Sequence, residues 1–208
     1  MYDHDLDTKG VFAFLRKQCP QGRHPAYPGP LQAVKVFASS VLSGYPESVL
    51  SPDERKDFCT MNQAFSYIGV ELLQGRRLVP SCYTIRNVLG ETRPGDSKSE
   101  SATTLLNWQF EASSDMVSWV ILDKRVFYPE NQIMRGPPSS KVQQLAKKGC
   151  VSTWGIDPYV FSPEEQEAGF KYFRIVQIGT NYEGSCNLSL SALEVYGLTN
   201  DAQNWERK

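Results

Sequence analysis

The sequence predicts an all-β domain, a sandwich or barrel of many short antiparallel strands. Three observations support this prediction. Several segments alternate strictly between apolar and polar residues, the breaks between them are rich in proline, glycine or small polar residues, and helical signals are few. The 208 residues, of which 40% are hydrophobic and 22% charged, are enough for one folded domain. We expect two packed antiparallel sheets with about eight main strands.

The clearest strand is predicted over residues 106–112, where Trp108 and Phe110 face the core and the polar residues between them face out. A period of two is what a half-buried strand requires. Residues 66–72 and 82–88 alternate in the same way. Further strands are predicted at residues 33–38, 117–122, 151–154, 170–178 and 188–196.

Turn and cap residues separate these strands. Residues 113–116 (SSDM) favour a tight hairpin, since serine and aspartate bond readily to their own backbone. Ser51 and Ser162 each precede a proline and suit the N-cap of a short helical turn. Residues 18–30, 90–104 and 129–149 are predicted as long loops, which often carry function. We expect one domain over residues 1–199 and a polar tail over residues 200–208.

The charge pattern excludes several classes of partner. A net charge of −1 leaves no electrostatic footprint for nucleic acid or for an anionic membrane surface. The sequence has no run of about eighteen apolar residues, so no membrane span is predicted, and the acidic N-terminus is unlike a signal peptide.

The five cysteines are an odd number, widely spaced and without a Cys-x-x-Cys pair. This pattern predicts reduced thiols in a cytoplasmic or nuclear protein.

A set of ordered motifs gives a more specific prediction. It comprises YDHDLDTKGV at residues 2–11, PSCYTIR at 80–86, LNWQFEASSD at 106–115 with Trp119 following, TW at 153–154, FRI at 173–175 and LSLSALEVYG at 188–197. In order and spacing these motifs resemble the discoidin-like (F5/8 type C-like) domain of HECT-type ubiquitin ligases. The resemblance implies a galactose-binding-domain-like jelly-roll sandwich without catalytic residues. Met116 and Ala192 stand where that family tends to have glycine, and two of the long loops are longer than usual.

Catalytic and metal sites find little support in the residues. The only histidines are His4 and His24, and no feature favours their pairing with a nucleophile. Dispersed cysteines do not suit a zinc site. Asp3, Asp5 and Asp7 resemble the start of a calcium loop, although Phe14 stands where an EF-hand has its closing glutamate. The alternative is a solvated acidic turn leading into the first strand. We expect no cofactor, with calcium the one ion left open.

Two tryptophans and two arginines are the next candidates. Trp108 and Trp119 have the spacing of core residues on the two strands of a hairpin. Arg86 and Arg174 lie in otherwise apolar strands, which is costly unless each is paired. They either pair inside the fold, with Glu71 or Glu194 as partners, or offer a planar fork of donors to a carboxylate or peptide backbone.

The predicted ligand-binding residues lie toward one end of the sandwich, beside the long loops. They are Arg86, Asn107, Arg135, Trp154 and Arg174, of which Trp154 is either an aromatic residue at the rim of the site or part of the core.

The function expected from these features is non-catalytic. The main hypothesis is a module that recognises a protein or peptide partner within a ubiquitin-ligase-like or other intracellular assembly. The alternative is a carbohydrate-binding module, because sugars stack on exposed aromatic rings and the predicted loops offer four tyrosines. These are Tyr27, Tyr45, Tyr128 and Tyr182. A hydrolase on the same scaffold is disfavoured by the shortage of histidine.

Overall fold

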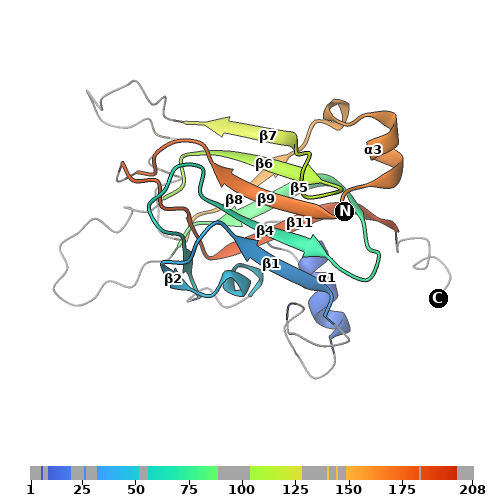
Figure 1. Cartoon of the computed structure of the whole chain (residues 1–208), viewed down its shortest axis with the longest axis horizontal. Helices are drawn as coiled ribbons and strands as arrows, with labels where there is room; N and C mark the ends of the chain where they lie inside the picture. The colour runs from blue at the N-terminus through green and yellow to red at the C-terminus, as the bar shows by residue number, and fades with distance from the viewer. Residues whose placement is uncertain are drawn as a thin grey trace.

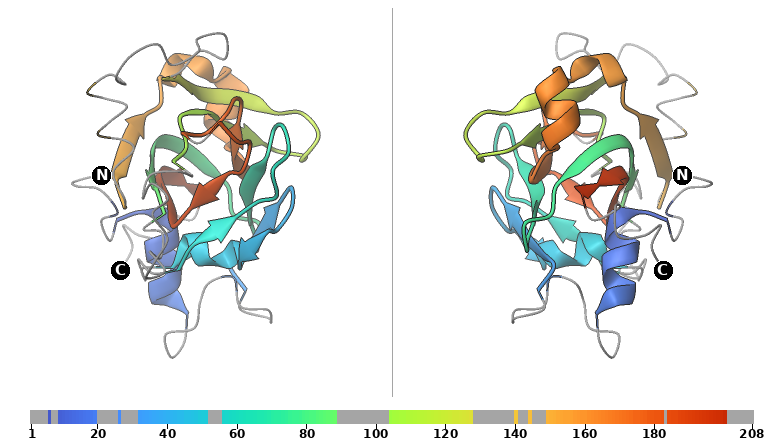
Figure 2. Two further views of the ribbon diagram at one scale, coloured as in Figure 1. Left: turned by 90° about the vertical axis from the view of Figure 1, so that its left-hand side faces the viewer. Right: turned by 90° about the vertical axis from the view of Figure 1, so that its right-hand side faces the viewer.

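The protein is a sandwich of two antiparallel sheets, as predicted (Figure 1). The computed structural model describes residues 6, 9–19, 26, 32–51, 56–88, 104–127, 140, 144, 149–182 and 184–200. One sheet has five strands in the order β1-β4-β9-β6-β7, and the other has three in the order β11-β5-β8. A small third sheet, β10-β3-β2, lies at one end. Figure 2, viewed from the two ends of the molecule, shows the layers.

Each predicted strand segment contains a strand, although several bounds differ by up to four residues and the short strands β2 and β3 were not predicted. The larger sheet contains β1 (Val34–Ala38), β4 (Tyr67–Leu72), β9 (Tyr172–Gln177), β6 (Asn107–Ser113) and β7 (Val120–Val126). The facing sheet contains β11 (Ala192–Thr199), β5 (Leu78–Arg86) and β8 (Val151–Gly155). The small sheet contains β10 (Ser189–Leu190), β3 (Phe58–Cys59) and β2 (Ser43–Gly44).

The core lies between the two main sheets and is rich in aromatic rings. Trp108 and Phe110 of β6 are fully buried, as their alternation predicts. Phe110 stacks on Tyr83 of β5 with ring centroids 4.3 Å apart. The indole Nε1 of Trp108 donates to the Tyr83 hydroxyl at 2.8 Å, and that hydroxyl donates to Asp123 Oδ2 at 2.6 Å. The sheets are therefore joined by both packing and hydrogen bonds.

The segment predicted as one strand over residues 188–196 is divided at Ser191. The part before it, β10, pairs with β3, and the part after it, β11, pairs with β5. The backbone N–H of Ser191 donates to the carbonyl of Arg86 at 2.9 Å, so the chain passes from one sheet to the other at this residue. An even alternation in the sequence does not reveal the change of partner strand.

The expectation of a strand after the acidic N-terminus is wrong, because α1 (Val11–Gln18) follows instead. Val11, Phe12 and Leu15 are buried on one side of this helix. The other described helical segments are η2 (Pro46–Leu50), η3 (Pro158–Val160) and α3 (Pro163–Ala168). None of the helices in the described part of the chain is long and apolar enough to cross a membrane.

The predicted helical turn at Ser162 is confirmed. Its hydroxyl accepts from the N–H of Glu165, whose carboxylate accepts in return from the N–H of Ser162, which is a complete capping box at the start of α3. The corresponding prediction at Ser51 falls on residues 52–55, outside the described part of the chain.

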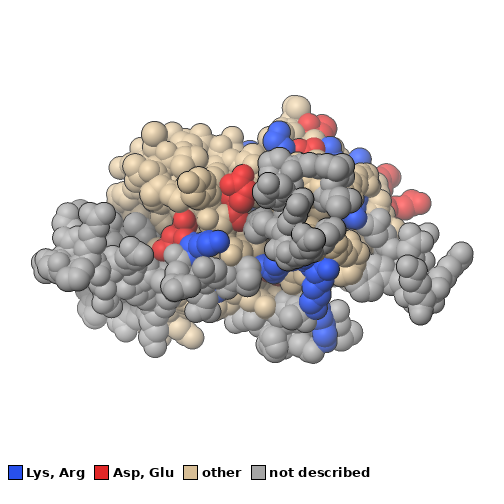
Figure 3. Space-filling view, turned by 90° about the horizontal axis from the view of Figure 1, so that it is seen from below, with Lys and Arg blue, Asp and Glu red and all other residues tan. Residues whose placement is uncertain are grey.

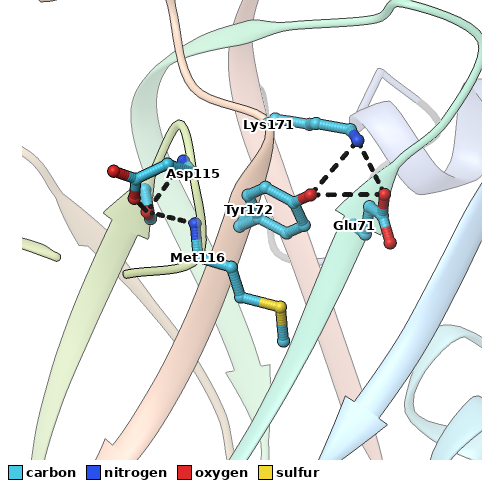
Figure 4. Close-up of polar contacts among 6 residues, drawn as sticks. Glu71, Asp115, Met116, Lys171 and Tyr172 are labelled. Carbon is cyan, nitrogen blue, oxygen red and sulfur yellow. Dashed lines mark hydrogen bonds and ion pairs between the residues drawn. The ribbon is translucent and has the colours of Figure 1, made fainter. Parts of the chain in front are cut away.

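The predicted hairpin at residues 113–116 is confirmed. Asp115 Oδ1 accepts from the N–H groups of Val117 and Ser118, each at 2.8 Å. These N–H donors lower the pKa of Asp115 to about 2. Met116 has φ +65°, the left-handed conformation that glycine adopts most easily. Ser113 Oγ accepts from the N–H of Met116, which fixes the turn (Figure 4).

The prediction that Trp119 is a core residue is wrong. The strand β7 begins at Val120, three residues later than predicted, and a bulge at Phe110/Glu111 shifts its register against β6. Trp119 precedes the strand and lies against Arg174 on the outer face of the five-stranded sheet. It is half-buried rather than part of the core.

The surface carries both signs of charge. In Figure 3 basic and acidic side chains are interspersed over the described residues of the face in view. None of the five cysteines, all of them in the described part of the chain, forms a disulfide. The cytoplasmic or nuclear location inferred from the cysteine pattern stays a prediction.

Candidate functional site

The two ends of the sandwich differ. At one end, called the loop end, β1, β5 and β9 finish and β4, β6 and β11 begin (left in Figure 1). The helices α1 and α3 lie toward the other end. Recognition by a rigid sandwich concentrates in loops at one end, so the loop end is where a ligand site is expected.

Arg86 and Asn107 lie at the loop end, as predicted. Arg86 ends β5 and is 4% exposed, and its Nε donates to Ser191 Oγ at 3.0 Å. Asn107 begins β6 and is 3% exposed, and its Oδ1 accepts from the N–H of Phe127 at 3.0 Å. These contacts hold the ends of neighbouring strands together. They leave little of either side chain for a ligand.

The other predicted ligand-binding residues do not gather with these two. Arg174 lies in the middle of β9 on the outer face of the sheet, paired with Glu111. It therefore forms an internal pair, although not with Glu71 or Glu194. Trp154 on β8 packs against the core, with its ring centroid 5.6 Å from that of Trp108 and 4.4 Å from the Cζ of Arg125.

Some predicted residues cannot be placed. Arg135, the histidines His4 and His24, and the possible calcium ligands Asp3, Asp5 and Asp7 lie outside the described residues. Within the described residues, no three or more histidine, cysteine, aspartate or glutamate side chains form a group that could hold a metal ion.

Two adjacent loops at the loop end carry a patch of exposed apolar side chains. The N–H of Met61 donates to Ser40 Oγ at 3.1 Å, and the N–H of Leu42 donates to the carbonyl of Cys59 at 2.8 Å, so the loops are hydrogen-bonded to each other. We call this set of side chains the loop-end patch. It consists of Val41, Leu42, Met61 and Phe65.

Phe65 is the most unusual member of this patch. Its side chain is 69% exposed, and its backbone has φ +57°. A bulky residue in the left-handed region costs about 1–3 kcal/mol and persists only where the surroundings impose it. Here the next residue, Ser66, is fully buried, and its hydroxyl donates to the carbonyl of Gln63 at 2.9 Å. The fold therefore holds an aromatic ring in solvent at an energetic cost.

A third loop fixes the base of this arrangement. Asn62 Oδ1 accepts from the N–H of Cys186 at 2.8 Å, and Asn187 Nδ2 donates to the carbonyl of Thr60 at 2.8 Å. The N–H of Leu188 also donates to Thr60 Oγ1 at 2.9 Å. Residues 60–66 are thus hydrogen-bonded to residues 186–188, which lie far away in sequence.

The chemistry available at the loop end is that of binding. The exposed ring of Phe65 offers a flat apolar surface, and the exposed amide side chains of Asn62 and Gln63 offer hydrogen bonds. Tyr45 is also exposed, but it follows β2 and lies outside these two loops. Sequence reasoning named Tyr45 as a candidate but missed Phe65, because residues 60–65 read only as the break before a strand. No local sequence pattern predicts a phenylalanine in the left-handed backbone conformation. Of the other tyrosines considered, Tyr182 is half-buried, and Tyr27 and Tyr128 lie outside the described residues.

No protein-family model matches the chain. Similar solved structures include the CBM32-5 module of CpGH89 from Clostridium perfringens, in complex with GalNAc-β-1,3-galactose. It has a TM-score of 0.53 at 13% identity, over 79% of this chain and 95% of that one. The CBM32-3 module of a family 31 glycoside hydrolase from the same organism has a TM-score of 0.50 at 14% identity, over 80% and 92%. CBM62 of Clostridium thermocellum Xyl5A has a TM-score of 0.50 at 13% identity, over 79% of this chain and 94% of that one.

These comparisons correct the main functional expectation. The similar structures are carbohydrate-binding modules, which contradicts the expected protein- or peptide-binding module of a ubiquitin-ligase-like assembly and favours the carbohydrate alternative. The resemblance to the ligase-associated branch is not shown. Its motifs consist largely of core and turn residues, such as Trp108 and Asp115, which specify a sandwich and not its ligand. The chain has the galactose-binding-domain-like jelly-roll fold that these modules share.

Proposed function

We propose that this protein is a carbohydrate-binding module that holds a sugar at the loop-end patch. The observation that carries the proposal is Phe65, a 69% exposed ring held in a left-handed backbone conformation by a hydrogen-bonded loop. Strain of this kind is retained where a function needs the side chain in that place. The likeness of the fold to modules that bind carbohydrate supports the class of ligand.

The physical basis is a preformed apolar platform with polar groups beside it. One face of a pyranose ring is lined with C–H groups and packs on an aromatic ring, while its hydroxyls need hydrogen-bond partners. Phe65 supplies the ring, and Asn62 and Gln63 supply amides. Because residues 60–66 are tied to their neighbours before binding, little conformational entropy is lost when a sugar binds.

The proposal can be tested with immobilised glycans, followed by titration of the best ligand. We expect Phe65→Ala to weaken binding about tenfold, because an aromatic stacking contact is worth about 0.5–1.5 kcal/mol. The matched control is Tyr159→Ala, a ring 92% exposed in η3, away from the loop end. The control should bind as the unmodified protein does. Unchanged affinity in Phe65→Ala would place the site elsewhere.

A further inference from the structure

The outer face of the five-stranded sheet carries a second cluster with binding chemistry, centred on Arg174. This residue lies on β9 between Gly69 of β4 and Glu111 of β6. Its Nε donates to Glu111 Oε2 at 2.7 Å. Glu111 is nearly buried, with its side chain 8% exposed, whereas 22% of the Arg174 side chain is exposed. The arginine is thus anchored by the nearly buried Glu111, while part of its side chain faces solvent.

Aromatic rings hold the guanidinium group in place. Its Cζ lies 3.8 Å from the ring centroid of Trp119 and 5.3 Å from that of Tyr67. Phe37 continues the row, with its ring centroid 6.2 Å from that of Tyr67. Phe37 covers Gly69, where a Cβ atom would lie 2.5 Å from the ring. Three rings and one arginine therefore cross the outer face from β1 to the β6–β7 hairpin.

The terminal amino groups of Arg174 are available to a ligand. Its described hydrogen bond and ion pair both use Nε, and no other described residue accepts a hydrogen bond from Nη1 or Nη2. A guanidinium group presents these donors as a rigid planar fork that matches the two oxygens of a carboxylate. The Trp119 ring, 3.8 Å from Cζ, limits the positions that the fork can take before a ligand arrives.

The charges on this face favour an anion. Glu71 is already neutralised by Lys171, whose Nζ lies 2.7 Å from Glu71 Oε1, and the Tyr172 hydroxyl donates to the same oxygen at 3.5 Å (Figure 4). Lys35 is opposite Glu71, and Lys124 is opposite Gln109, so both add positive charge to this face. The strands thus bring more basic than acidic side chains to the outer face of a protein whose net charge is −1.

From this arrangement we infer a second binding site, specific for the carboxylate of an acidic sugar such as a uronic acid. Arg174 would bind the carboxylate, and the rings of Trp119 and Tyr67 would contact the apolar face of the sugar. That the ligand is a carbohydrate rests on the proposed function, but the residues are distinct from those of the loop-end patch.

The test compares two ligands of equal length on the whole ¹⁵N-labelled chain, trigalacturonate and a neutral galactose trisaccharide. We expect trigalacturonate to shift the NMR signals of the Arg174 Nε–H and the Trp119 indole N–H, and the neutral trisaccharide to shift neither. Binding of trigalacturonate should weaken when salt rises, because an ion pair is screened. Equal shifts with both ligands, or no shift of these two signals, would overturn the inference.

Variants separate this site from the loop-end patch. Arg174→Met alone would leave Glu111 buried without its partner, so we pair it with Glu111→Gln. The double variant should bind trigalacturonate at least tenfold more weakly. In Phe65→Ala, trigalacturonate should still shift the signals of the Arg174 Nε–H and the Trp119 indole N–H. If the double variant binds like the unmodified protein, the outer-face site is wrong and the loop-end proposal stands. If Phe65→Ala instead binds neutral glycans with unchanged affinity, the loop-end proposal is wrong and the outer-face site is unaffected. The signals of the unmodified protein decide the question should the double variant not fold.

Discussion

At the scale of single residues, the backbone conformation of Phe65 destabilises the folded protein. Replacement by glycine removes the strain of the left-handed backbone, and a ring that is 69% exposed contributes little burial. We expect Phe65→Gly to raise the free energy of unfolding by about 1 kcal/mol. The same variant should lose binding at the loop-end patch. Urea unfolding and glycan titration on one preparation measure both effects. A less stable variant would show that Phe65 supports the fold.

Glu194 is a second residue whose environment has a measurable consequence. It is 4% exposed, and its carboxylate accepts from the N–H groups of Phe12 at 2.7 Å and Ala13 at 2.9 Å. Burial raises the pKa of Glu194 from 4.5 to about 7, against the opposing effect of these hydrogen bonds and of Arg16. Between these two pH values the folded protein holds a proton that the unfolded chain has released.

The sign of the pH dependence follows from that difference. Because the folded state binds more protons in this window, the contribution of Glu194 to stability falls as pH rises from about 4.5 to about 7. We expect Glu194→Gln to lose this part of the pH dependence. Urea unfolding at pH 5 and pH 7.5 measures it in both proteins. If the free energy of unfolding changes equally between these two pH values in the unmodified protein and in Glu194→Gln, another group is responsible for the pH dependence.

At the scale of elements, long-range contacts decide where segments begin and end. The helix α1 has 8 residues, too few for stability on its own. It forms because Glu194, on β11, caps its first N–H groups and because Phe12 and Leu15 are buried. Gly10 lies so close to the Glu194 side chain that a Cβ atom would collide with it. The start of the helix thus depends on a residue far along the chain.

The junction between β5 and β11 is a second element decided by tertiary contacts, and it gives a prediction for Arg86. Its Nε and Nη2 donate to the hydroxyl and the carbonyl of Ser191, where the chain changes sheet. We expect Arg86→Met to lower the free energy of unfolding by about 1–3 kcal/mol, since buried acceptors lose their donors. Sugar binding per folded molecule should not change. If Arg86→Met is as stable as the unmodified protein but binds sugar more weakly, Arg86 belongs to the ligand site.

At the scale of the whole molecule, the sheets are held together by their shared aromatic core. Trp108 is fully buried and is hydrogen-bonded to Tyr83 of the facing sheet. We expect Trp108→Ala to lower the free energy of unfolding by about 3–5 kcal/mol, through the cavity that it leaves. Trp119→Ala is the matched control, because that ring lies on the outer face and should cost much less. Thermal and urea unfolding compare the two. Equal losses would contradict the assignment of the core.

The sequence by itself determined the features that depend on neighbours along the chain. A period of two identified the strands around Trp108 and Ile68, because a strand exposes alternate residues to its two sides. Ser162 and Asp115 marked a helix start and a hairpin, since each bonds to backbone N–H groups within three residues. These interactions are local, so a one-dimensional pattern contains them, and the all-β class follows from their number.

Only the tertiary structure decided the features that depend on distant partners. The start of α1 required Glu194, the break at Ser191 required Arg86, and the outward place of Trp119 required the register shift between β6 and β7. The candidate site has the same origin, since Phe65 is held in solvent by a loop whose anchors lie more than a hundred residues away, at Cys186 and Asn187. Contacts between residues so far apart in sequence leave no periodic signal, because their geometry exists only once the sheets have packed.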